Sequence, residues 1–145
     1  MNLTRLTRKE LDILYVLWGT EEALSATEIT EQAPELNKNT VNALLRKLLR
    51  AELIRVDDIG YSGTVLTRKY RAMLSHEEYM RQSIADDTRK VADAASRRGV
   101  ITAILDAARN AGTLEEEIRE IEDLLEEYRK IAESDGKTYE KSSGT

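Results

Sequence analysis

Apolar side chains recur every three or four positions over residues 6–50, which is the spacing of one face of an α-helix. The common helix-start pattern of Ser or Thr followed three positions later by Glu occurs at Thr7–Glu10, Ser25–Glu28, Ser75–Glu78 and Thr113–Glu116. A further helix is expected to start at Asn37, whose side chain can cap free N–H groups. We therefore predict three helices before residue 52, with inward faces made of Leu11, Leu14, Leu17 and Trp18, then Ala26 and Ile29, then Val41, Leu44, Leu45, Leu48 and Leu49.

After Glu52 the apolar spacing changes to one that is typical of β-strands. Residues 53–59 are predicted to form one strand, Gly60–Gly63 a turn, and Val65–Met73 a returning strand. Three helices followed by a two-stranded ribbon are the plan of a winged helix-turn-helix domain, which we assign to residues 1–74. The expected fold class is mostly α with a small two- or three-stranded β-wing.

The chain from Ser75 to about Glu133 has helical spacing throughout, with expected breaks at Arg98-Gly99 and Asn110–Gly112. Its later part carries an apolar seam at alternating four- and three-residue steps, as in coiled coils. We predict a helical dimerisation domain over residues 75–133 and a disordered tail over 134–145. The expected interface residues of a homodimer are Ile101, Ile104, Leu105, Leu114, Ile118, Ile121, Leu125 and Tyr128. Folding of this region back onto the N-terminal domain of the same chain is the open alternative.

The net charge of −5 hides a local excess of basic residues. Lys and Arg outnumber Asp and Glu in residues 36–71, whereas acidic residues dominate the flanks, and DNA binding depends on such a local patch. The helix from Asn37 would enter the major groove, where Arg can bond to guanine, Asn to adenine, and small side chains can lie against a thymine methyl group. The predicted base-reading residues are Asn39, Thr40, Asn42, Ala43 and Arg46. The predicted phosphate contacts are Lys38, Lys47, Arg50, Arg68 and Lys69.

The sequence offers nothing positive for enzyme chemistry. It has no cysteine, and its single histidine, His76, lies beside Glu77 and Glu78 at helical positions that point to different sides. It also lacks a glycine-rich phosphate loop. We expect no catalytic residue, no metal site and no cofactor. Since no apolar run approaches a membrane-spanning length of ~20 residues, we expect a cytoplasmic protein without a membrane partner.

Three strings of residues resemble one family in particular. They are Leu6-Thr7 with Glu10–Leu14 and Leu17-Trp18, then Lys38–Val41 with Leu44–Leu48, and then Tyr70 with Ser75–Tyr79. Together they resemble the bacterial penicillinase repressor family (BlaI/MecI/CopY-like regulators), strongly over about residues 3–80 and more loosely over 98–130. The resemblance implies a homodimeric transcriptional repressor that binds double-stranded DNA at inverted repeats, with its base-reading helix at Lys38–Arg46.

The chain also departs from that family at two functional features. Members that control β-lactam resistance are cleaved at an Asn-Phe bond, and copper-responsive members use a cysteine cluster, but this chain has neither Phe nor Cys. An inducer or a protease as the releasing signal therefore stays open, as does the role of Tyr61 in a wing that is longer than the family's usual one. A winged-helix adaptor that binds protein instead of DNA is the alternative function, since the acidic net charge and the apolar tail allow it.

Overall fold

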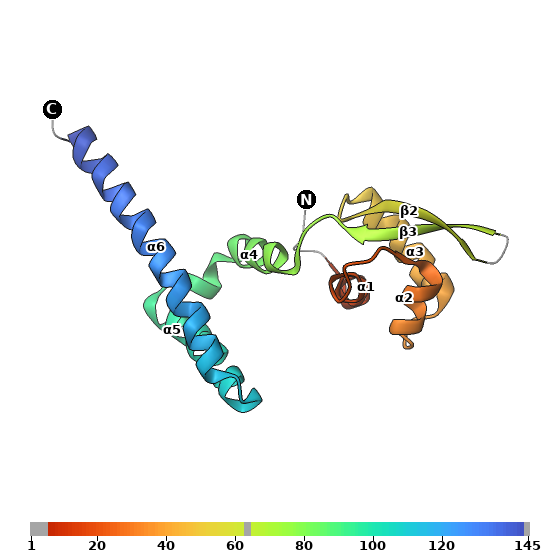
Figure 1. Cartoon of the computed structure of the whole chain (residues 1–145), viewed down its shortest axis with the longest axis horizontal. Coiled ribbons are helices and arrows are strands. Elements are labelled where there is room, and N and C mark those ends of the chain that lie inside the picture. The colour runs from red at the N-terminus through yellow and green to blue at the C-terminus, as the bar shows by residue number, and fades with distance from the viewer. Residues whose placement is uncertain (1–5, 63–64, 144–145) are drawn as a thin grey trace. The chain divides into compact units, whose positions relative to one another are not determined.

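The computed structural model describes residues 6–62 and 65–143 (Figure 1). The chain divides into two compact units, Met1–Thr88 and Arg89–Thr145. The elements, in order, are α1 (Arg8–Trp18), β1 (Leu24–Ser25), α2 (Ala26–Gln32), α3 (Lys38–Arg50), β2 (Ile54–Ser62), β3 (Val65–Ala72), α4 (His76–Asp86), the 3₁₀ turn η2 (Thr88–Val91), α5 (Ala94–Ala111) and α6 (Leu114–Ser143).

The core of the first unit lies where α1, α2 and α3 meet. The fully buried side chains come from all three helices and from the residue just before β2. They are Ile13, Leu14, Ile29, Val41, Leu45, Leu48 and Leu53. The predicted inward faces are confirmed, with Leu11, Trp18, Leu44 and Leu49 packed at the edge of this core. Because α3 buries one face here, its opposite face is left for solvent or a partner.

The helix starts predicted at Thr7, Ser25, Asn37 and Ser75 are confirmed by capping hydrogen bonds. α6 begins after Thr113 as predicted, but the Thr113 hydroxyl donates to the carbonyl of Ala108. Ser25 and Ser75 each form a complete capping box with Glu28 and Glu78. The Asn37 side chain accepts a bond of 2.8 Å from the backbone N–H of Thr40, which fixes the start of α3. These local bonds satisfy N–H groups that a helix leaves free in its first turn.

The sheet has the strand order β1-β3-β2 and is antiparallel throughout. Figure 1 shows the β2–β3 ribbon extending beyond the three helices. The prediction of a turn over Gly60–Gly63 is wrong for residues 60–62. These residues belong to β2, in which Gly60 pairs with Thr67 and Tyr61 pairs with Leu66. Gly63 lies outside the described residues, as does the side chain of Tyr61. The wing is thus a longer ribbon than the glycine pattern indicates.

Helix α4 packs with the first unit. Nε1 of Trp18 donates a hydrogen bond of 2.9 Å to the carbonyl of Leu74, and the Trp18 ring stacks on His76 at 4.5 Å between centroids. Tyr79 is buried beside them. These contacts explain why the first compact unit extends to Thr88, past the boundary at residue 74 that the sequence pattern favours.

The second unit differs from the prediction in where its helices begin and end. α5 runs through the expected break at Arg98-Gly99, because Asp93 caps its start and a single glycine inside a helix costs only about 1 kcal/mol relative to alanine. The break at Gly112 is confirmed, with a left-handed φ of 78° that favours glycine. α6 continues to Ser143, through most of the segment expected to be disordered, since residues 130–142 contain six helix-favouring Ala, Glu or Lys residues and no proline. Within the described ranges, every helix is too short or too polar to span a bilayer.

Candidate nucleic-acid interface

The exposed face of α3 is a stripe opposite its buried side. At about 100° per residue, Asn39, Ala43, Arg46 and Arg50 fall on neighbouring positions of the helix surface, and all four are exposed. Val41, Leu45 and Leu48 lie on the opposite side in the core. The structure therefore brings three of the five predicted base-reading residues together on one solvent-facing surface.

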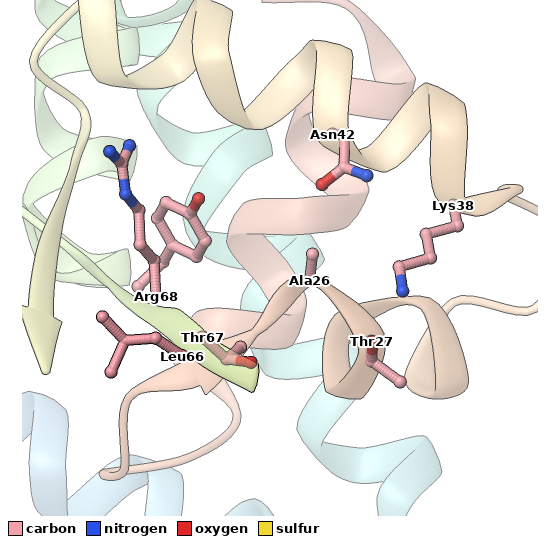
Figure 2. A pocket seen from close by; sticks show the side chains of 8 residues that line it. Ala26, Thr27, Lys38, Asn42, Leu66, Thr67 and Arg68 are labelled. Atoms are coloured by element: carbon pink, nitrogen blue, oxygen red, sulfur yellow. The ribbon is translucent and has the colours of Figure 1, made fainter. Parts of the chain in front are cut away.

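Asn42 lies on one flank of this stripe, beside a concavity between α2, α3 and β3. The concavity has a volume of about 530 Å³. Figure 2 shows Asn42 and Lys38 projecting from α3 toward α2 and β3, while Leu66 and Arg68 project from β3. We call this concavity the wing groove, lined by Thr27, Lys38, Asn42, Leu66, Arg68 and Tyr70, with Ala26 and Thr67 completing its wall.

Thr40 lies on the other flank of α3 and is half-buried. It is seven positions before Lys47, so the two side chains share one side of the helix. That side faces α1, because Nζ of Lys47 lies 2.7 Å from Oε1 of Glu10. The five predicted base-reading residues are thus spread over the stripe and both of its flanks.

Glu10, which pairs with Lys47 beside the exposed stripe of α3, was not identified from the sequence. Its side chain is 3% exposed, whereas that of Lys47 is 58% exposed. A buried carboxylate is costly unless it is paired, so Glu10 holds the ammonium of Lys47 against α1. The signal was present: Glu10 is three and four positions before the core residues Ile13 and Leu14, which places a carboxylate on an inward face.

Lys69 also has a carboxylate neighbour inside the chain. Its Nζ lies 3.8 Å from Oε1 of Glu28. The pKa of Glu28 is lowered from its usual value mainly by the hydrogen bond from the backbone N–H of Ser25, with a smaller contribution from Lys69. Lys69 therefore sits over the start of α2.

Two more cations of the basic segment are paired along the ribbon. Asp57 accepts a bond of 2.9 Å from Nε of Arg71 and lies 2.9 Å from Nη2 of Arg55. The hydrogen bond from Arg71 is the main cause that lowers the pKa of Asp57. Arg71 also donates to the carbonyl of Glu21, which ties the ribbon to the segment before β1.

The remaining cations of residues 36–71 are Lys38, Arg46, Arg50 and Arg68. All four are exposed, and within the described part of the chain none of them has an ion pair with a carboxylate. They lie on α3 and on β3, around the exposed stripe and the wing groove. The cations of this segment that have no carboxylate partner among the described residues therefore lie around the exposed stripe of α3 and the wing groove.

The first unit has three helices, a short strand between the first and second of them, and an antiparallel two-stranded ribbon after the third. This arrangement defines a winged helix-turn-helix protein. Residues 6–127 match the sequence model of the penicillinase repressor family. The chain belongs to this family, and it is a DNA-binding transcriptional regulator.

Similar solved structures include RosR of H. salinarum, with 24% identity, a TM-score of 0.43, and coverage of 75% of this chain and 99% of that chain. A complex structure named RosR-S1 has 25% identity, a TM-score of 0.44, and coverage of 77% of this chain and 99% of that chain. Comparison with curated protein sequences finds no match.

Proposed function

We propose that this chain is a homodimeric, sequence-specific repressor that binds an inverted-repeat operator in the cytoplasm, and we assign it no catalytic activity. The observation that carries the proposal is the face of α3 that presents Asn39, Ala43 and Arg46 to solvent, directly opposite a fully buried face. In the winged helix-turn-helix plan, this second helix of the pair lies in the major groove.

Each base-reading residue has a chemical role in this proposal. Arg46 bonds to O6 and N7 of a guanine, because its guanidinium has no carboxylate partner in the described chain. Asn39 and Asn42 bond to adenine edges from the stripe and from the wing-groove flank. Ala43 and Thr40 are small enough to lie against thymine methyl groups, with Thr40 on the flank that faces α1.

The phosphate contacts divide according to their partners inside the chain. Lys38, Arg50 and Arg68 have no carboxylate partner among the described residues and are proposed to hold DNA phosphates. Lys47 and Lys69 were expected to do the same. Their pairs with Glu10 and Glu28 support a structural role instead, in which they brace α3 and the wing.

Homodimerisation is proposed for the second unit because its apolar side chains lack a core. Leu105, Leu114 and Ile121 are half-buried, and the other five predicted interface residues, Ile101, Ile104, Ile118, Leu125 and Tyr128, are exposed. Large contiguous apolar surface is a mark of an interaction site. A second copy supplies the same stripe by two-fold symmetry, which then matches an inverted repeat in the DNA.

The direct test is a gel shift with the DNA that lies upstream of the chain's own coding sequence, in the presence of excess unrelated duplex. The proposal predicts a discrete complex that survives the competitor and weakens steeply with salt. Binding that the competitor abolishes, or no binding at low salt, would contradict it and favour a protein-binding adaptor.

The role of Arg46 is tested against Arg50, four positions further along the same stripe. Arg46→Ala should cost roughly 1–3 kcal/mol on the operator and relax the preference at one base pair. Arg50→Ala should weaken all duplexes alike, as the loss of a phosphate contact does. If Arg46→Ala also weakened every sequence equally, the assignment of Arg46 to a base would be wrong.

A further inference from the structure

A cavity of the first unit lies where the end of α1, the end of β3 and the start of α4 meet. It has a volume of about 420 Å³, and the side chains that shape it include Leu17, Trp18, Arg71, Met73, His76 and Glu78. We call it the α4 cavity. Its described lining shares no residue with that of the wing groove. The volume falls in the range of roughly 300–1,000 Å³ that is usual for small-molecule sites.

One wall of the α4 cavity is apolar and held in place. Leu17 is 5% exposed and belongs to the core. The Trp18 ring is fixed by its hydrogen bond of 2.9 Å to the carbonyl of Leu74 and by its stacking on His76. Met73 is 50% exposed, although its backbone N–H is bound to the carbonyl of Leu53. The cavity therefore offers a fixed apolar surface to the side chain of a small molecule.

The α4 cavity also carries two opposite charges. Nε of Arg71 donates to Asp57 and Nη1 donates to the carbonyl of Glu21, so these bonds do not use Nη2. Oε2 of Glu78 accepts a bond of 3.3 Å from the backbone N–H of Ser75, and this capping bond does not use Oε1. A guanidinium group and a carboxylate thus line the same cavity, each with an atom that these bonds leave to a ligand.

We propose that the α4 cavity binds a free amino acid with an apolar side chain, which acts as an effector that weakens operator binding. Arg71 donates to the carboxylate of the ligand, Glu78 accepts from its ammonium group, and the apolar wall contacts its side chain. An apolar acid would leave Glu78 unmatched, and an apolar amine would leave Arg71 unmatched. The zwitterion matches both charges. The effector role rests on the proposed binding to an operator, whereas the binding site does not.

Arg71 connects the α4 cavity to the wing. Its partner Asp57 lies at the register shift between Val56 and Asp58, where β2 bulges against β3. A ligand carboxylate on Arg71 competes with Asp57 for the same guanidinium group. Because a bulge sets the local bend and twist of a ribbon, the loss of this bond changes the direction of the wing. An occupied cavity should therefore lower the affinity for DNA.

Binding to the cavity can be measured without DNA. Trp18 is the only tryptophan, so its fluorescence reports on titration with L-leucine, L-methionine or L-phenylalanine. Three controls each lack one part of leucine: glycine lacks the side chain, isocaproate the ammonium group and isoamylamine the carboxylate. Each should bind at least about tenfold more weakly than leucine, because each loses one set of contacts. Isocaproate that bound as tightly as leucine would show that the zwitterion assignment is wrong.

Glu78→Gln tests the proposed ammonium contact in the folded protein. A glutamine at this position can still complete the capping box with Ser75, so α4 should keep its start. The variant should bind L-leucine at least about tenfold more weakly, while isocaproate binding should not fall. Glu77→Gln is the matched control, since Glu77 is the neighbouring carboxylate on α4 and does not line the cavity. Equal leucine affinities for Glu78→Gln and the wild type would overturn the proposal.

The effector role is tested by gel shift with and without saturating L-leucine. Operator affinity should fall about tenfold, and the operator should lower the affinity for leucine by the same factor. Glu78→Gln should bind the operator like the wild type and lose this response. Leucine that binds without changing operator affinity would overturn the effector role.

Two further outcomes separate this inference from the proposed function. If fluorescence and calorimetry both showed no binding of any of the three amino acids, the α4 cavity would be refuted as their site. Failure of the wild type to bind any operator would instead refute the proposed function, and leucine binding to the DNA-free chain would still decide the cavity.

Discussion

The two compact units of the chain bury their apolar side chains to very different extents. In the first unit, residues such as Ile13, Ile29 and Leu45 are completely or almost completely buried. In the second unit, Ala108 is the one buried residue within 89–137, while Leu125 and Tyr128 are 52% and 59% exposed. The first unit has a core of its own, whereas the second presents an exposed apolar stripe. This difference supports the proposal that the first unit reads DNA and the second pairs two chains.

The largest expected effect is in the core of the first unit. Leu45→Ala should destabilise that unit by about 2–5 kcal/mol, since a buried Leu loses its transfer free energy and leaves a cavity. Urea unfolding monitored by the fluorescence of Trp18, the only tryptophan, reports on this unit. Leu66→Ala is the control, because an exposed Leu leaves no cavity. Equal unfolding midpoints for the two variants would contradict the account of the core.

The next effect is in the stripe of the second unit. Leu125→Glu places a charge in the proposed interface and should raise the dimer dissociation constant at least about 100-fold, which is roughly 2.7 kcal/mol. The unfolding of the first unit should not change. Glu127→Gln, two positions along α6, should leave the dissociation constant as it is. A Leu125→Glu chain that sediments like the wild type would remove the support for this interface.

The Glu10–Lys47 pair is expected to contribute less. Lys47→Met leaves the Glu10 carboxylate buried without its partner, at a cost of about 1–2 kcal/mol, below the value for a fully buried pair because Lys47 is half exposed. Glu10→Gln should cost a similar amount, and the double variant less than the sum, because both changes remove one interaction. Strict additivity in this double-mutant cycle would show that the pair is not coupled.

Operator binding by the same variants separates bracing from DNA contact. If Lys47 braces α3 against α1, Glu10→Gln and Lys47→Met should weaken binding alike and leave the salt slope unchanged. A lower slope in Lys47→Met alone would return Lys47 to the phosphate contacts.

The smallest expected effect is a pH dependence of the free energy of unfolding that arises from carboxylates at helix starts. The folded-state pKa of Glu28 is lowered mainly by the backbone N–H of Ser25, and that of Asp93 mainly by the backbone N–H of Ser96. A lowered pKa means that each carboxylate contributes stability above its unfolded-state pKa, and that this is lost as the pH falls through the folded-state pKa. Glu28→Gln should therefore flatten the acid limb of the first unit's stability curve. An unchanged acid limb in that variant would contradict this role.

The features of this fold that could be predicted from the sequence are those set by local patterns. The capping boxes at Ser25 and Ser75, the cap at Asn37 and the two faces of α3 each depend on residues within one or two helical turns. The exposed stripe of the interface could be predicted for the same reason. The sequence motifs at residues 6–18 and 38–48 that resemble the penicillinase repressor family independently indicate the same base-reading helix.

The features that sequence reasoning missed depend on distant residues or on context. Glu10 and Lys47 are 37 positions apart, so their pair requires the packing of α1 on α3. The sequence around Gly60 and Gly99 is typical of a break, but cross-strand pairing holds Gly60 in β2, and Gly99 lies inside the 18-residue helix α5. The docking of α4 depends on Trp18 stacking against His76, which no local pattern indicates.

Sedimentation equilibrium of the full chain, alone and with an operator duplex, tests the division of labour between the two units most directly. The account predicts a dimer without DNA and two chains per inverted repeat, with Leu125→Glu monomeric and binding a single half-site weakly. A wild-type chain that is monomeric at all concentrations and binds one copy per duplex would contradict it.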